Sequence, residues 1–355
     1  MKWSLRLGRF LGIDVFLHFT FLLFVGYIAF ASHGSAGTVA FVIAAFTCVV
    51  LHEYGHALMA RRYGIPTKDI TLLPIGGVAR LERMPSDPKQ ELWVAVAGPA
   101  VNVAIVAVLW LICYLAKIPV TRDFEALSHI RGEFIVLLLW FNVTMIGFNM
   151  LPAFPMDGGR VLRALLAMKM DYAKATRWAA TVGKAMAMVF AYYAIFHSAT
   201  PMLIVIAFFV WMGAGDEAAA AEERSLLAGV KVRDAMLVEF RRVSPEDTSG
   251  TVAQFILQGW QADFPVVYDG QVVGLLTRQD AISGLTSGPS VPVSSLMRQE
   301  VPSCIPSENL DDALERMKQH ELPLMPVLDD GKLVGLVTPE NTVEFILIRR
   351  ALEKR

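Results

Sequence analysis

Long apolar runs fill the first 215 residues of the chain, and shorter segments with alternating polarity follow them. A helix needs about 20 apolar residues to cross a lipid bilayer. Six runs approach this length, the last of them shorter than the rest, at residues 12–31, 39–60, 92–115, 134–151, 178–196 and 201–212. The pattern therefore predicts a polytopic α-helical membrane protein with about six transmembrane helices.

The first run has an alternative interpretation as a removable signal peptide. It has a basic start, an apolar stretch and the small residues Ala29 and Ala31 at its end. The apolar core of a signal peptide has about 7–15 residues. The run 12–31 is longer, with Asp14 and His18 near its start, so we expect a retained first helix.

The remaining residues contain an internal repeat. The segment FPVVYDGQVVGLLT at 264–277 recurs as MPVLDDGKLVGLVT at 325–338, and 232–236 recurs as 293–297. Both pairs have the same offset of 61 residues (326 − 265 and 293 − 232), which indicates two copies of one unit. Each copy predicts a helix, a strand, an Asp-Gly turn, a strand and a helix.

The change in pattern also divides the chain. The run DEAAAAEE at 216–223 predicts a helical linker. We therefore expect a membrane domain at 1–215, a linker at 216–229 and two α/β repeats at 230–287 and 288–355.

Composition supports a membrane protein and argues against an ordinary soluble enzyme, a disordered chain and a disulfide-rich domain. Apolar residues make up 55% of the chain and charged residues only 18%, against about a quarter in soluble proteins. The mean hydropathy is +0.48. The net charge of −1 gives no argument for a nucleic-acid partner. Cys48, Cys113 and Cys304 are far apart and predict neither a disulfide framework nor a metal site.

Basic residues are distributed unequally between the two sides of the predicted bundle. With both termini on one side, that side receives the basic residues at 2–9, 61–89 and 160–177. The opposite loops hold only Lys117, Arg122 and Arg131. Because cytoplasmic loops carry an excess of Lys and Arg, we expect both termini and the repeats to be cytoplasmic, in a multi-pass protein of the cell membrane.

The strongest chemical signal is the sequence His52-Glu53-Tyr54-Gly55-His56. Residues four apart share one helix face, so both imidazoles can bind one metal ion, and neutral imidazole suits Zn²⁺. Glu53 can accept a proton from water that zinc activates. Ionisable groups inside an apolar run are costly in a bilayer, and a bound cation compensates them, which argues against a chance match.

A catalytic zinc also needs a third protein ligand and an open position. The candidate is Asp157, in the sequence NMLPAFPMDGGR at 149–160. Pro152 and Pro155 break the preceding helix, and Asp157 begins the next helical segment. Asp157 could alternatively cap that helix.

In combination, these residues resemble the site-2 protease family of intramembrane zinc metalloproteases, in its bacterial and archaeal branch with cystathionine-β-synthase (CBS) repeats. The matching residues are His52, Glu53, His56, Asn149, Pro152, Pro155, Asp157, Gly158 and AGPAVN at 97–102. The resemblance covers most of residues 1–215, without a PDZ insertion. It implies that His52, His56 and Asp157 bind one catalytic Zn²⁺ and that Glu53 is the general base. It also implies substrate contacts for Asn102 and Asn149, whose alternative role is hydrogen bonding between helices.

The apolar segment at 70–79 predicts strands that could hold a substrate. A peptide bond in a helix must be unwound before attack, and strand addition would supply its backbone partners. Gly76 and Gly77 would permit a close approach of the two backbones. An ordinary hairpin is the alternative.

The repeats resemble a tandem CBS module, or Bateman module, and such modules commonly bind adenine nucleotides such as AMP or ATP. The resemblance implies nucleotide contacts at Thr277, Asp280 and Thr338, with Asn341 in place of the second carboxylate. A module that only dimerises, giving a homodimer without ligand, is the alternative.

These observations predict an intramembrane zinc metalloprotease that cleaves a membrane-protein substrate within or near a transmembrane segment, with modulation by adenine nucleotide. One alternative is a CBS-regulated transporter or channel, which would need a polar pathway through several spans. Another is an inactive relative that binds membrane partners, against which the intact His-Glu-His set argues.

Overall fold

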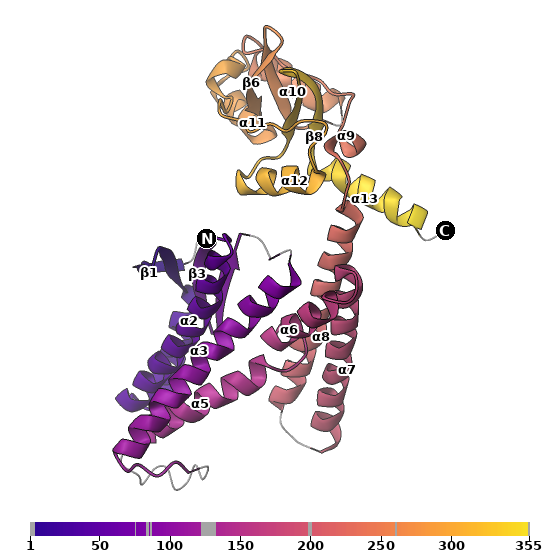
Figure 1. Ribbon diagram of the computed structural model, residues 1–355. Helices are drawn as coiled ribbons and strands as arrows, with labels where there is room; N and C mark the ends of the chain where they lie inside the picture. Colours follow the sequence, from indigo (N-terminus) through magenta and orange to yellow (C-terminus); the bar gives the residue numbers. More distant parts are fainter. Residues whose placement is uncertain are drawn as a thin grey trace. The chain divides into compact units, whose positions relative to one another are not determined.

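The structure is a computed structural model that describes residues 4–74, 76–82, 85, 87–121, 133–197, 201–259 and 261–353 (Figure 1). Residues up to Ala221 form one compact unit, and residues from Glu222 onward form a second. Some of the basic residues that entered the orientation argument lie outside the described residues: Lys2, Arg83, Arg122 and Arg131.

The first unit is mostly helical. Among the described residues, four helices are long and apolar enough to cross a membrane: α2 (Ala36–Arg62), α3 (Pro88–Leu115), α7 (Tyr172–Phe196) and α8 (Pro201–Leu227). The apolar helices α1 (Phe19–Ala31) and α5 (Glu133–Asn149) are shorter, and α6 (Asp157–Ala167) is short and amphipathic. A helix overlaps each of the six predicted runs, but the number of spans stays a prediction.

The prediction of a helix over residues 12–18 is wrong. The strands β1 (Ser4–Phe10) and β2 (Ile13–His18) form an antiparallel hairpin, and the helix begins only at Phe19. Residues along β2 alternate strictly between buried and half-buried, which is the two-residue period of a strand. The length of the apolar run suggested a helix, but its alternation decides the structure.

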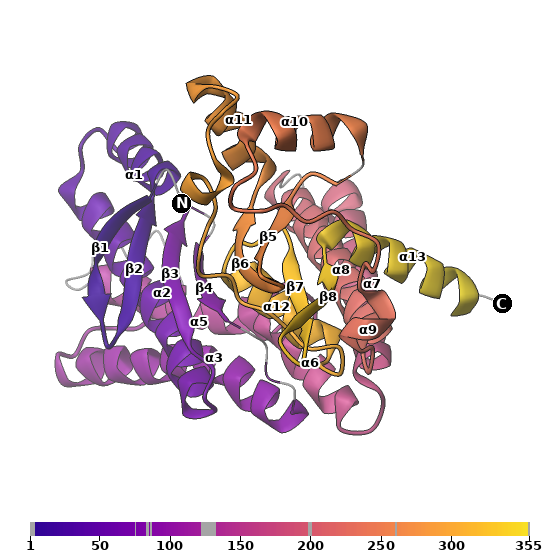
Figure 2. The same cartoon turned by 90° about the horizontal axis from the view of Figure 1, so that it is seen from above.

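The strands expected near residues 70–79 are confirmed. They are β3 (Thr67–Leu73) and β4 (Gly76–Leu81), and Figure 2 shows the sheet order β1-β2-β3-β4. The central pair, β2 and β3, is parallel, with Val15 opposite Ile70. The sheet packs on α2, because Ile13, Val15 and Ile70 form one buried cluster with Tyr54 and Ala57. Strand β4, at the edge, therefore lies close to the His-Glu-His turn.

Helix α8 is longer than the run that predicts it. It continues past residue 212 through the charged run 216–223, which is helical as predicted, and ends at Leu227. The division between the two compact units falls inside this helix. The residue boundaries of the domains stay a prediction.

The second unit contains the two repeats, and the predicted order of elements is confirmed in both. The first has α10 (Ser249–Gln258), β5 (Phe264–Tyr268), β6 (Gln271–Leu276) and α11 (Arg278–Ser287); the second has α12 (Leu310–Gln319), β7 (Met325–Asp329), β8 (Lys332–Val337) and α13 (Pro339–Glu353). The short helices α9 (Val232–Ala235) and η1 (Val293–Ser295) precede them. Both Asp-Gly turns have positive φ at both residues, as a tight hairpin of this type requires.

The two repeats also exchange strand pairing. Leu237 pairs with Leu336 in the second hairpin, and Arg298 pairs with Leu275 in the first. These pairs correspond under the repeat offset, since 237 + 61 = 298 and 275 + 61 = 336. Each hairpin is thus extended by a segment near the start of the other repeat, so the two copies pack together as one unit.

A buried ion-pair network joins three helices of the first unit. The side chain of Arg163 on α6 is only 2% exposed. Its Nε donates to Oε1 of Glu91 on α3 (2.7 Å), and its Nη1 donates to Oε2 of Glu217 on α8 (2.6 Å). The guanidinium also lies 4.9 Å from the centre of the Phe154 ring. This network ties α6 to α3 and α8.

Replacement of Arg163 by methionine should lower the free energy of unfolding by about 3–5 kcal/mol, because two carboxylates would lose their buried counterion. Thermal unfolding of the full chain in detergent measures this change. The matched control is Arg6→Met, which breaks the exposed pair with Asp14 and should cost less than about 1 kcal/mol. Equal effects of the two substitutions would contradict the assigned role of the network.

Candidate metal centre

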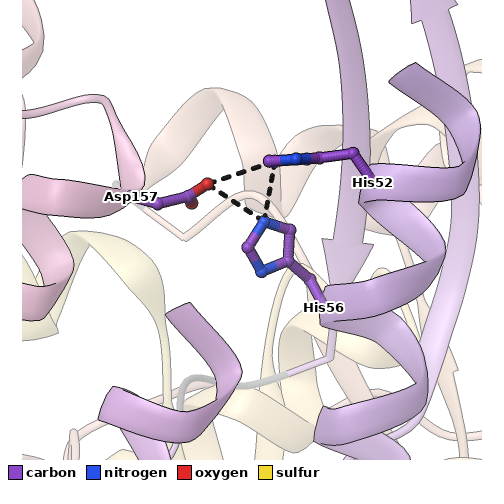
Figure 3. Close-up of side chains that lie close together, drawn as sticks. All are labelled: His52, His56 and Asp157. Atoms are coloured by element: carbon purple, nitrogen blue, oxygen red, sulfur yellow. Dashed lines mark hydrogen bonds and ion pairs between the residues drawn. The ribbon is translucent and has the colours of Figure 1, made fainter. Parts of the chain in front are cut away.

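Two histidines from one helix and a carboxylate from another meet inside the first unit (Figure 3). His52 and His56 lie on consecutive turns of α2, and Asp157 is the first residue of α6. The two Nε2 atoms are 3.1 Å apart, and each is 3.1 Å from Oδ2 of Asp157. All three residues are buried. The expectation that these distant side chains come together is confirmed.

The three donor atoms fit one metal ion. Two imidazole nitrogens and one carboxylate oxygen are a known ligand set for Zn²⁺, and three protein ligands leave a position open for chemistry. Gly98 on α3 provides the space, because a Cβ there would overlap Nε2 of His56 and would lie 2.7 Å from Nε2 of His52. The donor cluster therefore packs against α3 at Gly98, where the helix carries no side chain.

Asp157 does not act as the helix cap that the sequence left open. Met156 is the N-cap residue of α6, and Asp157 follows it inside the first turn. The Asp157 carboxylate contacts the two histidines instead. A carboxylate in the first turn is still favoured by the helix dipole, so this position suits a buried acidic side chain.

The second nitrogen of each imidazole faces a fixed acceptor. Nδ1 of His56 is 2.7 Å from the carbonyl oxygen of Val94, which can only accept. His56 therefore donates from Nδ1 and presents the lone pair of Nε2 to the cluster. Nδ1 of His52 is 2.5 Å from Oδ1 of Asn102.

Glu53 lies between the histidines and the edge of the sheet. Its Oε2 accepts a hydrogen bond from the Ala79 amide of β4 (3.2 Å). A Cβ on Gly77 would lie 2.7 Å from Cγ of Glu53, so the carboxylate side chain runs along the strand backbone. Because the Ala79 amide points to Glu53, it cannot also pair with β3. The backbone N–H and C=O groups of residues two apart in a strand point to the same side of that strand. The backbone groups of Gly77 and Ala79 therefore both face the outer edge of β4.

The other predicted substrate residues have different surroundings. Asn102 is fully buried, and its Nδ2 donates to Oδ1 of Asn142 (2.8 Å), so both ends of its amide contact protein groups. Asn149 is the last residue of α5 and is half-buried. Gly76 begins β4. Sequence reasoning missed Asn142, although an amide inside the apolar run 134–151 is the same kind of signal that Asn102 gave.

In the second unit, a cavity of about 660 Å³ lies between the two repeats. Its lining combines residues of the first repeat with a short segment of the second: Asp263, Thr277, Arg278, Gln279, Ile282, Ser283, Arg298, Glu321, Leu322 and Pro323. Oγ1 of Thr277 donates to Oδ2 of Asp280 (2.7 Å), and Nε of Arg298 is 3.6 Å from the same oxygen. Burial raises the pKa of the Asp263 carboxyl, which also accepts from the Arg278 amide.

The corresponding positions of the second repeat have different chemistry. Thr338 is not among the residues that line this cavity. The Asn341 side chain donates to the Ala235 carbonyl (2.6 Å), so its amide is engaged. Under the repeat offset, Asp263, Arg278 and Ser283 become Leu324, Pro339 and Glu344, and Arg298 corresponds to Leu237. The site around Thr338 that is equivalent to this cavity thus lacks both arginines.

Similarity to known proteins agrees with this geometry. Residues 40–131 and 118–190 match peptidase family M50, and residues 293–347 match the CBS domain. The chain is 32% identical to a zinc metalloprotease of Methanocaldococcus jannaschii over 100% of this chain and 99% of that protein. It is 30% identical to the protein Rip3 of Mycobacterium tuberculosis, covering 99% and 94% of the two chains.

A solved structure of the site-2 protease from Methanocaldococcus jannaschii shares 37% identity with this chain. It covers 61% of this chain and 95% of its own, with a TM-score of 0.46. The family assignment rests on the similarity to the full length of the Methanocaldococcus jannaschii zinc metalloprotease and on the match to peptidase family M50. The chain belongs to peptidase family M50, the site-2 protease family of membrane zinc metalloproteases, and carries a C-terminal CBS module.

Proposed function

We propose that His52, His56 and Asp157 bind the zinc of this metalloprotease and that Glu53 is its general base, in the hydrolysis of a peptide bond within or near a transmembrane segment. The observation that supports this most is the convergence of three buried donor atoms, from α2 and α6, at 3.1 Å from one another inside the helical unit. When bound, zinc supplies a Lewis acid that activates water and polarises the scissile carbonyl.

In this proposal, Glu53 moves the protons of the reaction. Its carboxylate accepts a proton from water and passes it to the leaving amine. Glu53 directly follows His52 on α2, and its carboxylate interacts electrostatically with both histidines and with Asp157. The Ala79 amide gives the carboxylate a fixed partner before substrate arrives.

The outer edge of β4 is the proposed substrate site. The backbone groups of Gly77 and the carbonyl of Ala79 face this edge and can pair with an extended peptide, while the Ala79 amide holds Glu53. Gly77 has no side chain, so the peptide can lie close to Glu53. The substrate class is therefore a membrane-protein segment, from a single-pass protein or a signal-peptide-like remnant, in an unwound conformation. Gly76 at the start of β4 and Asn149 at the end of α5 remain predicted substrate contacts.

Replacement of Glu53 by glutamine should lower cleavage of a tagged single-pass transmembrane peptide by at least about 10²–10⁴-fold, because the proton acceptor is removed. The variant should keep the zinc content of the wild type, as measured by elemental analysis. In contrast, His56→Ala and Asp157→Ala should lose zinc. Cleavage at the wild-type rate by the Glu53 variant would exclude it as the base.

We also propose that the ends of the chain and the CBS module are cytoplasmic. The support is the excess of basic residues on one side of the predicted bundle, which includes Arg61 and Arg62 at the end of α2. A reporter enzyme that is active only in the cytoplasm should be active when fused after Arg355. The same reporter inserted after Lys117 should be inactive, and the opposite pattern would reverse the orientation.

Adenine nucleotide is the proposed ligand of the cavity between the CBS repeats. Arg278 and Arg298 line the cavity and supply positive charge for phosphate. Thr277 also lines it, and Thr277 together with Asp280, which its hydroxyl contacts just outside the lining, supplies partners for ribose hydroxyls and phosphate. The equivalent site around Thr338 has Pro339 and Leu237 in place of these arginines and an engaged amide at Asn341. We therefore infer one nucleotide per chain. Dimerisation through these repeats stays a prediction from the sequence.

Replacement of Thr277 by alanine should weaken AMP binding to the full chain by roughly tenfold, the loss expected for one hydrogen bond to a charged group. Thr338→Ala is a matched control, because each threonine accepts a hydrogen bond from the third residue after it. Calorimetry should give one site per chain in the control. Two sites, or equal losses in both variants, would contradict a single cavity. Protease activity that stays constant while AMP saturates its site would exclude modulation.

A further inference from the structure

Two buried asparagines connect His52 to a backbone carbonyl on a third helix. Asn102 on α3 and Asn142 on α5 are both fully buried. Nδ2 of Asn142 donates to the Leu138 carbonyl (2.8 Å), and Oδ1 of Asn142 accepts from Nδ2 of Asn102 (2.8 Å). Oδ1 of Asn102 is 2.5 Å from Nδ1 of His52. The chain of contacts therefore begins at a backbone group and ends at the metal cluster.

The donor and acceptor roles along this series of hydrogen bonds are set at the Leu138 end. A carbonyl oxygen can only accept, so the amide nitrogen of Asn142 must face Leu138 and its oxygen must face Asn102. That oxygen in turn requires the amide nitrogen of Asn102, which leaves the Asn102 oxygen toward His52. His52 must then carry its proton on Nδ1, and the lone pair of Nε2 faces Asp157 and His56.

We propose that Asn142 is a positioning residue of the zinc site, which fixes the orientation of the Asn102 amide and, through it, the tautomer of His52. The inference rests on the proposed function of His52 as a zinc ligand. A cation can be bound only by a nitrogen without a proton, so the tautomer with the proton on Nε2 cannot bind. Asn142 thus acts on zinc affinity without contact to the zinc ligands.

Asn102 does not hold this orientation without Asn142. The other contact of its Nδ2 is with Sδ of Met145 at 3.7 Å, and a thioether is a weak acceptor. With Asn142 removed, the amide can turn by 180° and place its NH₂ group against Nδ1 of His52. His52 would then accept at Nδ1 and keep its proton on Nε2. The Val94 carbonyl fixes His56 directly and needs no such intermediate.

The test is the zinc affinity of the full chain in detergent, measured by competition with a chelator. Asn142→Leu keeps a similar volume and removes the acceptor for Asn102, so the dissociation constant of zinc should rise about 10–100-fold. Leu139→Ala is the control on the same helix, because Leu139 is buried but lies outside this chain of contacts. It should lower stability and leave zinc affinity unchanged.

A second background separates tautomer control from packing. In Asn102→Asp, the side chain offers only acceptor oxygens to His52, so it has no NH₂ group to turn toward Nδ1. Adding Asn142→Leu to this background should therefore cause no further loss of zinc affinity. The same 10–100-fold loss in both backgrounds would overturn the proposal, as would unchanged affinity in Asn142→Leu alone.

If Asn142→Leu does not accumulate, Asn142→Asp carries the test. A carboxyl keeps an acceptor for Asn102, so zinc affinity should stay that of the wild type, and a large loss would overturn the proposal. His52→Ala separates the assignment of His52 as a zinc ligand from the proposal that Asn142 fixes its tautomer. If that variant binds zinc as tightly as the wild type, the ligand assignment fails. If His52→Ala loses zinc but Asn142→Leu binds it like the wild type, the ligands stand and the tautomer control fails.

Discussion

The cost of placing ionisable groups in an apolar interior shapes this molecule. His52, His56 and Asp157 lie buried within the helical unit, and each has polar partners there. The same cost governs Arg163, which two carboxylates surround. Unpaired charges in such surroundings would be expelled or neutralised. The arrangement of α2, α3 and α6 is therefore the arrangement in which these groups satisfy one another.

Sequence reasoning succeeded where local spacing determines the outcome. Two histidines four residues apart on a helix share a face, and the repeat offset fixes two equivalent hairpins. It failed for β2, because run length was weighed above alternation and the partner strand β3 lies far along the chain. The Arg163–Glu91 pair spans 72 residues and the Asn102–Asn142 pair spans 40, so no local pattern could join them. A polar residue does, however, stand out in an apolar stretch of sequence, and Asn142 could have been recognised in this way.

The two halves of the repeat module show how a duplicated sequence becomes asymmetric. Backbone geometry is retained, since both hairpins have the same turn and the same irregularity in register. Side chains at the cavity diverge, with arginines beside one copy and Pro339 and Glu344 in the other. The exchange of strand pairing binds the copies into one body, so the second repeat supports the cavity of the first through Leu322 and Pro323.

The Arg163 network has a consequence for how the protein acquires its metal. The pair with Glu91 ties α6 to α3, while Asp157 at the start of α6 and Gly98 on α3 border the donor atoms. These contacts form from side chains alone, so the link between the two helices does not pass through the metal site. Small metal-dependent domains, by comparison, gain their folding energy from the ion itself. In this protease, the ion pair holds α6 beside α3 without any contribution from the proposed zinc ligands, so helix packing and the donor cluster are fixed by different residues.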